Sequence, residues 1–207
     1  MIGNWIRSIR KARAKRRANV VAASSVALQV IYLYAGQPKN FEKWFGDRIE
    51  DDDLRELLSH VYERFFAYGA FFVVPAAIVK VVLGESLSSY GLRVGKWWKG
   101  LPILAVGLPA ATASAWYAAG KKEFQDEYPL SETARRGGRD LLYYEIANFH
   151  YYIGWEFFYR GYLQHGLEGA YGVEGATAFQ TVASTLMHIG KPFDETAGAG
   201  FAGPLFG

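Results

Sequence analysis

The chain has 207 residues, of which 51% are hydrophobic and 16% aromatic, and its formal net charge is +3. This length suits one domain, or a membrane protein with four to six spanning helices. The absence of cysteine excludes disulfides, thiolate catalysis and cysteine-based zinc sites.

A basic arm opens the chain. Residues 1–17 contain seven basic residues and no acid, and an uncharged apolar stretch follows at once, at 18–36. Such an arm can bind nucleic acid, but directly before an apolar segment it is typical of a flank that stays in the cytoplasm. A cleaved signal peptide is the alternative, and the length of the apolar run and the lack of a small-x-small site favour an uncleaved anchor. We therefore predict a multi-pass protein of the plasma or inner membrane, with a cytoplasmic N-terminus, lipids as neighbours and no nucleic-acid partner.

Two further segments are long enough to cross a membrane, because about 20 apolar residues span a hydrocarbon core of roughly 30 Å. The first runs over about 62–84 and includes Pro75, which a membrane helix tolerates when its neighbours satisfy the freed backbone groups. An amphipathic helix that starts at the acidic run 50–53 leads into it. The second is the uncharged stretch 100–120. Aromatic side chains, which favour the bilayer interface, flank these segments at Tyr34, Trp44, Trp97, Trp98, Tyr117 and Tyr128.

The C-terminal third predicts two more spans. Residues 141–168 contain no proline and would extend about 42 Å as a helix, with Glu156 near the middle. A glycine-containing turn at 169–172 leads into a second apolar helix over 173–190, and the small residues near the end of the chain resemble the start of another. The predicted fold is all-α: a transmembrane bundle (18–207) with five complete spans and the beginning of a sixth, preceded by the basic arm (1–17).

Glu156 and Arg160 are the first candidate site residues. They lie four apart and so share one face of a helix. A charged group at the bilayer centre costs about 2.5–3.5 kcal/mol on insertion scales, so such groups face a bundle interior and commonly mark a site. The alternative interpretation is a structural ion pair that pins two helices together.

His188 is the third candidate. If the chain reverses near residue 170, Glu156 and His188 reach depths that differ by about 6 Å on adjacent antiparallel helices. A carboxylate and an imidazole that converge in a low-dielectric cavity can hold and deprotonate a water molecule, and an arginine can orient the carboxylate or stabilise negative charge. The alternative is a histidine that only makes a packing hydrogen bond.

The sequences WEFFYRGYLQHGLEG and FQTVASTLMHIGKPFDET resemble the CPBP family of intramembrane proteases, bacterial relatives of the CAAX prenyl endopeptidase. The resemblance covers about 85–207 and is most specific at 155–192. The family's first motif has two adjacent glutamates with an arginine four residues after the second, its second motif ends in histidine, and a third motif has His-x-x-x-Asn or Asp. The resemblance matches Glu156 to the second glutamate, Arg160 to the arginine and His188 to the second-motif histidine.

Two departures and an absent motif accompany this resemblance. Trp155 stands where the family has its first glutamate, and Ser184 stands where it usually has phenylalanine. No third motif precedes Gly207, so we expect either a truncated chain or a member that has lost part of its site.

The resemblance implies an endopeptidase that cleaves membrane-associated proteins, such as prenylated or leader-bearing ones, with Glu156 as general base, His188 positioning water and Arg160 orienting the carboxylate. The family is often labelled metalloprotease, and Glu156 and His188 would be the ligands of a zinc or other divalent ion. A closed zinc site typically needs three protein ligands plus water, so a metal-free mechanism fits these residues equally well. The alternatives are a non-catalytic pseudoprotease acting as a membrane binding or scaffold protein and, more weakly, a transporter, for which the chain shows no inverted repeat.

Overall fold

The computed structural model describes residues 2–128 and 130–206, and all regular elements among them are helical, as the sequence predicts. The α-helices are, in chain order, α1 (Ile2–Ala35), α2 (Pro38–Phe45), α3 (Asp52–Tyr68), α4 (Val74–Ala77), α5 (Leu101–Ala119), α6 (Lys122–Glu127), α7 (Glu132–Arg135), α8 (Gly138–Glu156), α9 (Gln164–Leu186) and α10 (Phe193–Phe206). π-Helical segments lie at η2 (Gly69–Val73), η3 (Ile78–Val82) and η6 (Phe157–Leu163), and 3-10 turns at η1 (Gly46–Arg48), η4 (Leu87–Tyr90) and η5 (Trp97–Lys99).

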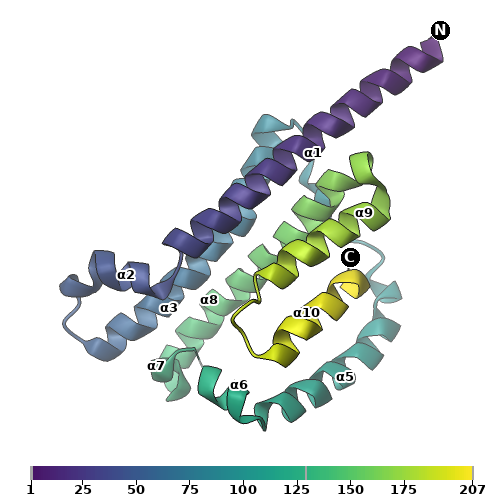
Figure 1. Ribbon diagram of the computed structural model, residues 1–207. Helices are drawn as coiled ribbons and strands as arrows, with labels where there is room; N and C mark the ends of the chain where they lie inside the picture. The colour runs from purple at the N-terminus through teal and green to yellow at the C-terminus, as the bar shows by residue number, and fades with distance from the viewer. Residues whose placement is uncertain (1, 129, 207) are drawn as a thin grey trace.

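Helix α1 is a single rod of 34 residues whose basic N-terminal part projects beyond the bundle (Figure 1). At 1.5 Å per residue it is about 51 Å long, well over the thickness of a hydrocarbon core. Its C-terminal part packs through a buried stripe with alternating spacings of three and four residues, the pattern of a helix with one core-facing side: Ala18, Val21, Ser25, Leu28 and Tyr32.

A second rod is built from α3, η2, α4 and η3, which follow one another without interruption. The Asp51 side chain caps its start by accepting a hydrogen bond from the backbone N–H of Leu54 at 3.0 Å. Pro75 is buried in this rod, and π-helical segments lie on both sides of it, where the missing proline N–H interrupts the regular backbone ladder. The sequence predicted the proline-containing span but not the π-helical segments.

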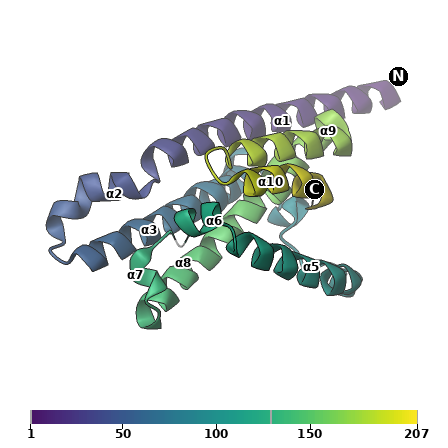
Figure 2. The ribbon, with the colours of Figure 1, turned by 60° about the horizontal axis from the view of Figure 1, so that its bottom comes forward.

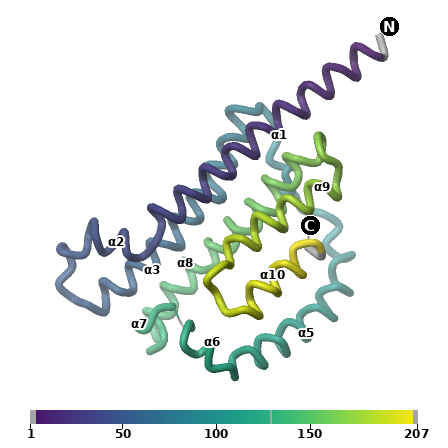
Figure 3. The backbone as a smooth tube through the Cα atoms, viewed as in Figure 1, coloured from purple at the N-terminus to yellow at the C-terminus, as the bar shows by residue number. Residues whose placement is uncertain are grey.

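The third rod runs from α8 through η6 into α9. It breaks at Gly172, whose φ of 74° lies in the left-handed region that favours glycine. The chain then reverses, and the second part of α9 and α10 run beside each other (Figure 3). The predicted turn at 169–172 is confirmed, whereas the helix predicted over 173–190 ends earlier, at Leu186, because residues 187–190 form a turn.

The core lies where these rods meet. Phe71 from η2 contacts Phe158 from η6 with ring centroids 4.7 Å apart, and Tyr159 and Tyr162 are fully buried beside them. Glycine permits a close approach to the backbone here: a Cβ on Gly161 would lie 2.7 Å from the Tyr90 carbonyl oxygen. Small residues at such crossings are the usual means by which membrane helices pack closely.

Three segments are long and apolar enough to cross a membrane: Asn4–Ala35, Asp52–Val82 and Leu101–Ala119. They correspond to the first three predicted spans. The segments predicted as the fourth and fifth spans are helical but do not belong to this group, since charged and polar residues interrupt their apolar runs. The five-span count therefore stays a prediction.

Helix α5 differs from the other two candidate spans. None of its residues is buried, and it stands away from the bundle, followed by α6 (Figure 2). It is apolar on every side, which suits a helix surrounded by lipid rather than by water.

Candidate functional site

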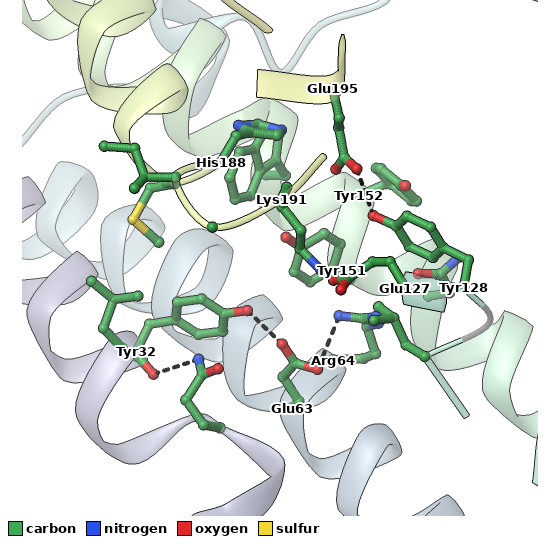
Figure 4. Close-up of a pocket in the computed structure, with 18 of the residues that line it drawn as sticks. Tyr32, Glu63, Arg64, Glu127, Tyr128, Tyr151, Tyr152, His188, Lys191 and Glu195 are labelled. Atoms are coloured by element: carbon green, nitrogen blue, oxygen red, sulfur yellow. Dashed lines mark hydrogen bonds and ion pairs between the residues drawn. The ribbon is translucent and has the colours of Figure 1, made fainter. Parts of the chain in front are cut away.

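A cavity of about 720 Å³ lies between α1, α3, α8 and the turn that joins α9 to α10 (Figure 4). We call it the His188 cavity. Its chemically reactive wall residues are Glu63, Arg64, Glu127, Tyr128, Tyr144, Tyr151, Tyr152, His188, Lys191 and Glu195. A cavity of this size with polar groups converging on it is the usual form of a binding site for a small molecule or a short peptide segment.

His188 follows the last turn of α9 and lines this cavity. Its Nδ1 lies 2.8 Å from the carbonyl oxygen of Ser184. A carbonyl oxygen only accepts, so Nδ1 must carry the proton, and in the neutral ring Nε2 is then the basic nitrogen. The His188 carbonyl accepts from the Thr196 hydroxyl at 2.7 Å, which ties the following turn to the start of α10. The local structure therefore fixes a histidine in the tautomer that can take a proton.

A buried ion pair forms the floor of the cavity. Glu63 and Arg64 are adjacent in α3, and their side chains are only 12% and 6% exposed. One carboxylate oxygen of Glu63 accepts from the Tyr32 hydroxyl at 2.8 Å, and the other lies 3.2 Å from Arg64 Nη1. Arg64 also donates to the Tyr144 hydroxyl at 3.1 Å, and its guanidinium carbon lies 4.8 Å from the ring centre of Tyr151. Both oxygens of Glu63 are thus engaged.

Two more carboxylates line the cavity from the opposite side. Glu127 of α6 forms an ion pair with Lys191. Glu195, in the first turn of α10, accepts from the Tyr128 hydroxyl at 2.8 Å through Oε2. Burial, and next the hydrogen bond to Glu195, raise the pKa of the Tyr128 phenol, so it stays a proton donor at neutral pH. Among residues 2–128 and 130–206, no other side chain or backbone group forms a hydrogen bond with Oε1 of Glu195.

Glu156 and Arg160 line a different pocket. Oε2 of Glu156 lies 3.6 Å from Arg160 Nε, close enough for an ion pair but too far for a hydrogen bond. The Glu156 side chain is 58% exposed. This second pocket, about 600 Å³, lies between η6 and residues 90–92, and we call it the Arg160 pocket.

The structure brings Glu156 and Arg160 together but does not bring Glu156 to His188. No ion pair or hydrogen bond joins those two side chains, and they line different pockets. Consecutive helix residues point about 100° apart. Trp155 points toward His188: the centroids of their rings lie 5.4 Å apart, and the ring planes are nearly perpendicular. Glu156, the next residue, therefore points in another direction.

Several cavity residues were missed from the sequence. Glu63 and Arg64 lie within the predicted second span, and two charges inside an apolar segment are a recognised sign of a site. Glu195 lies inside the second stretch that resembles the family, seven residues after His188. The tyrosines carried no comparable signal, because the helices are rich in aromatics throughout.

The sequence left open whether a divalent metal ion binds. The structure does not bring together the side chains that would hold one. In residues 2–128 and 130–206, no three His, Asp or Glu side chains are grouped so that they could hold a metal ion. Glu156 and His188, the two expected ligands, line separate pockets. The side chains present therefore do not fit a zinc site.

Comparison of the chain with protein-family models, with curated proteins and with solved structures gave no match. The resemblance to the CPBP proteases therefore depends on the motif residues themselves.

Proposed function

We propose that this protein is an intramembrane endopeptidase that hydrolyses a peptide segment in the His188 cavity. The observation that carries the proposal is a tautomer-fixed histidine in a polar cavity walled by carboxylates, within a chain that has three candidate membrane spans. The motif resemblance supports the same reaction class and names membrane-associated proteins as substrates.

The mechanism uses a water molecule held between His188 Nε2 and a carboxylate of the same cavity. The imidazole takes one proton as the water oxygen bonds to the peptide carbonyl carbon. The resulting imidazolium returns that proton to the amide nitrogen as the C–N bond breaks, giving a carboxylic acid and an amine. The Lys191 ammonium and the hydroxyls of Tyr144 and Tyr152 are the available donors for the negative charge on the carbonyl oxygen, since the Tyr32 and Tyr128 hydroxyls already donate to carboxylates.

Glu195 is the carboxylate that suits this role best. Both oxygens of Glu63 are engaged. Glu127 is held in an ion pair with the Lys191 ammonium, whereas Glu195 pairs through one oxygen with the neutral Tyr128 hydroxyl. Glu156, which the resemblance names as general base, would have to act from outside the cavity. We therefore propose Glu195, rather than Glu156, as the partner of His188.

A cleavage assay tests the proposal. The protein is reconstituted in detergent or lipid with a membrane-embedded peptide, and turnover is compared for wild type, His188→Ala, Glu195→Gln and Glu156→Gln. We expect the first two variants to lose about 100-fold or more, because a positioned general base contributes roughly 10²–10⁴-fold, and Glu156→Gln to stay within a few-fold of wild type. Equal turnover by wild type and His188→Ala would end the proposal. A selective loss in Glu156→Gln would return the role of base to Glu156.

A second candidate is a non-catalytic membrane protein that binds a peptide without cleaving it. The contact between Trp155 and His188 favours it, because an aromatic ring occupies the position where the family pattern has its first glutamate. This candidate predicts that a peptide photo-crosslinks to cavity residues such as Tyr152 and is recovered uncleaved. Recovery of cleaved peptide with wild type but not with His188→Ala would exclude it.

A further inference from the structure

Asn148 of α8 lines the His188 cavity, on the same face of the helix as Tyr144 and Trp155. It follows the first of these by four residues and precedes the second by seven, the spacing of side chains that share one helix face. Within residues 2–128 and 130–206, no hydrogen bond engages its carboxamide, and neither of its polar atoms is enclosed. Oδ1 and Nδ2 are therefore open to whatever enters the cavity.

A purely structural role would give this side chain a partner in the protein. Polar side chains inside a helix commonly bond the carbonyl four residues earlier, and Nδ1 of the nearby His150 lies 2.7 Å from the Ile146 carbonyl oxygen in this way. The Arg64 guanidinium, which could donate to an amide oxygen, donates to the Tyr144 hydroxyl instead. Asparagine is also a poorer helix former than alanine or leucine. A ligand therefore explains Asn148 better than the stability of α8 does.

The chemistry of a carboxamide matches the backbone of an extended peptide. Oδ1 accepts and Nδ2 donates, and the two atoms lie side by side. The N–H and C=O of one residue in an extended chain point to the same side, as in an antiparallel ladder, where one residue exchanges both hydrogen bonds with its neighbour. In an α-helix the same two groups point in opposite directions along the axis and are bonded within the helix. Only an extended residue can therefore pair with both polar atoms of the amide.

Other polar groups of the cavity wall are already engaged. The Lys191 ammonium is paired with Glu127, and the Gln37 amide donates to the Tyr32 carbonyl oxygen at 3.3 Å. A peptide group that leaves water or a helix for an enclosed site must find new partners, because an unpaired buried donor or acceptor is unfavourable. Asn148 offers such partners without adding a charge to the wall.

We propose that Asn148 is a specificity-determining residue of the His188 cavity: its carboxamide binds the N–H and C=O of one extended substrate residue. The cavity would then select peptide segments that are not helical. In membrane proteins, backbone groups free of internal bonds occur at helix ends and breaks, so we expect the bound segment to come from such a place. This inference rests on the proposed function in one respect, that the ligand of the cavity is a peptide.

The test measures peptide binding by the full chain in detergent. The chain carries His188→Ala so that the peptide stays intact, and the probe is a fluorescently labelled hydrophobic peptide followed by anisotropy. Asn148→Leu is close to asparagine in shape but makes no hydrogen bond. We expect it to weaken binding about tenfold, because two hydrogen bonds are lost. Asn40→Leu is the matched control, since Asn40 lies on α2 outside the cavity, and it should bind the peptide unchanged.

A series of N-methylated peptides gives the most specific prediction. Each backbone N–H of the probe is replaced in turn by N-methyl, which removes one donor. At the position that faces Oδ1, we expect methylation to weaken binding about fivefold or more when Asn148 is present and to have little effect in Asn148→Leu. Such coupling between one side chain and one ligand group is not produced by a merely structural role. A methylation profile that is the same with and without Asn148 would overturn the proposal.

A second comparison keeps Asn148 in place and so does not depend on the folding of Asn148→Leu. Two residues of the probe are changed either to α-aminoisobutyrate, which stabilises a helix, or to valine, which favours an extended chain. We expect the valine peptide to bind several-fold more tightly. Equal or tighter binding of the helix-stabilised peptide would also overturn the proposal.

Kinetics separate this inference from the proposed hydrolysis. With His188 intact, Asn148→Leu should raise KM about tenfold and change kcat little, as for a contact made equally before and during the reaction. Cleavage with KM and kcat both unchanged by Asn148→Leu would refute the role of Asn148 and leave hydrolysis standing. Binding that depends on Asn148, without cleavage by wild type, would refute hydrolysis and leave the peptide site standing.

Discussion

Glu63 and Arg64 place two opposite charges side by side in the interior of the bundle. Removing one partner of a buried pair is strongly unfavourable, because the other charge stays behind without compensation. We expect Glu63→Gln to lower the free energy of unfolding by about 3 kcal/mol, measured by denaturant or thermal unfolding in detergent. The control is Lys122→Ala, which removes an exposed pair with Asp126 and should change stability by less than about 0.5 kcal/mol. Similar effects of the two changes would contradict the burial of the Glu63–Arg64 pair.

Tyr128 links the start of α10 to the loop after α6 and gives a pH-dependent prediction. Its pKa is raised in the folded state by burial and by Glu195, so the folded protein holds a proton that the unfolded chain releases above about pH 10. The stability contributed by Tyr128 is therefore fully present below that pH and is lost as the pH rises further. We expect wild type to melt higher than Tyr128→Phe at pH 8, and the difference to shrink between pH 10 and 11. A difference that is constant over this range would refute the assignment.

At the scale of residues, the sequence predicted how far along the bundle Glu156 and His188 lie, but not the direction in which their side chains point. The number of residues between each of Glu156 and His188 and the turn predicts similar heights, and Trp155, the neighbour of Glu156, does contact His188. A one-residue difference, however, rotates a side chain by about 100°, and it is Trp155 that faces His188. The ion pair of Glu156 with Arg160 follows from i,i+4 spacing within one helix. Glu195 and the Glu63–Arg64 pair enter the cavity through contacts between segments far apart in the sequence, which spacing alone does not reveal.

At the scale of elements, the crossing of η6 with residues 87–90 depends on Gly161. A Cβ there would meet the Tyr90 carbonyl oxygen at 2.7 Å, and a backbone atom cannot move aside as a flexible side chain can. We expect Gly161→Ala to destabilise the protein by about 1–3 kcal/mol, the usual range for overpacking. Gly107→Ala in α5 is the matched control, because a Cβ there meets nothing within 4 Å. It should be neutral or stabilising by up to about 1 kcal/mol, as for glycine in a helix interior; equal losses in both variants would argue against a close crossing at Gly161.

The helices themselves were largely predictable, because each long apolar run is bounded by charges, glycine or proline. The uncharged run 100–120 became α5, and the glycine-containing turn at 169–172 became the reversal at Gly172. The π-helical segments were not predictable, since they arise where Pro75 and the crowded aromatics of η6 disturb a regular ladder. The spans predicted over 141–168 and 173–190 depend on how the bundle shields the charges of α8 and α9, which is a property of contacts between helices rather than of composition.

For the whole molecule, the way the first two rods are connected determines which segments lie at the same end of the bundle. Arg17 of α1 pairs with Glu85 at 3.3 Å, so the basic arm and the loop after the second rod lie at the same end of the bundle. The segment around Asp47, between the two rods, lies at the other end, beside α2 (Figure 1). Together with the basic arm, this arrangement predicts that the N-terminus and residues 85–99 face the cytoplasm.

Cysteine labelling tests this orientation directly, because the chain contains no cysteine and each introduced thiol is unique. In sealed vesicles that keep the cytoplasmic face inside, we expect Arg7→Cys and Lys96→Cys to resist a membrane-impermeant maleimide until detergent is added. Asp47→Cys should react at once; all three positions are exposed, so burial does not explain a difference. The reverse pattern would invert the orientation while leaving the bundle intact. Equal reactivity of all three thiols in sealed vesicles would mean that α1 and the second rod do not cross the bilayer, and the hydrolysis proposed for the His188 cavity would then lose its membrane setting.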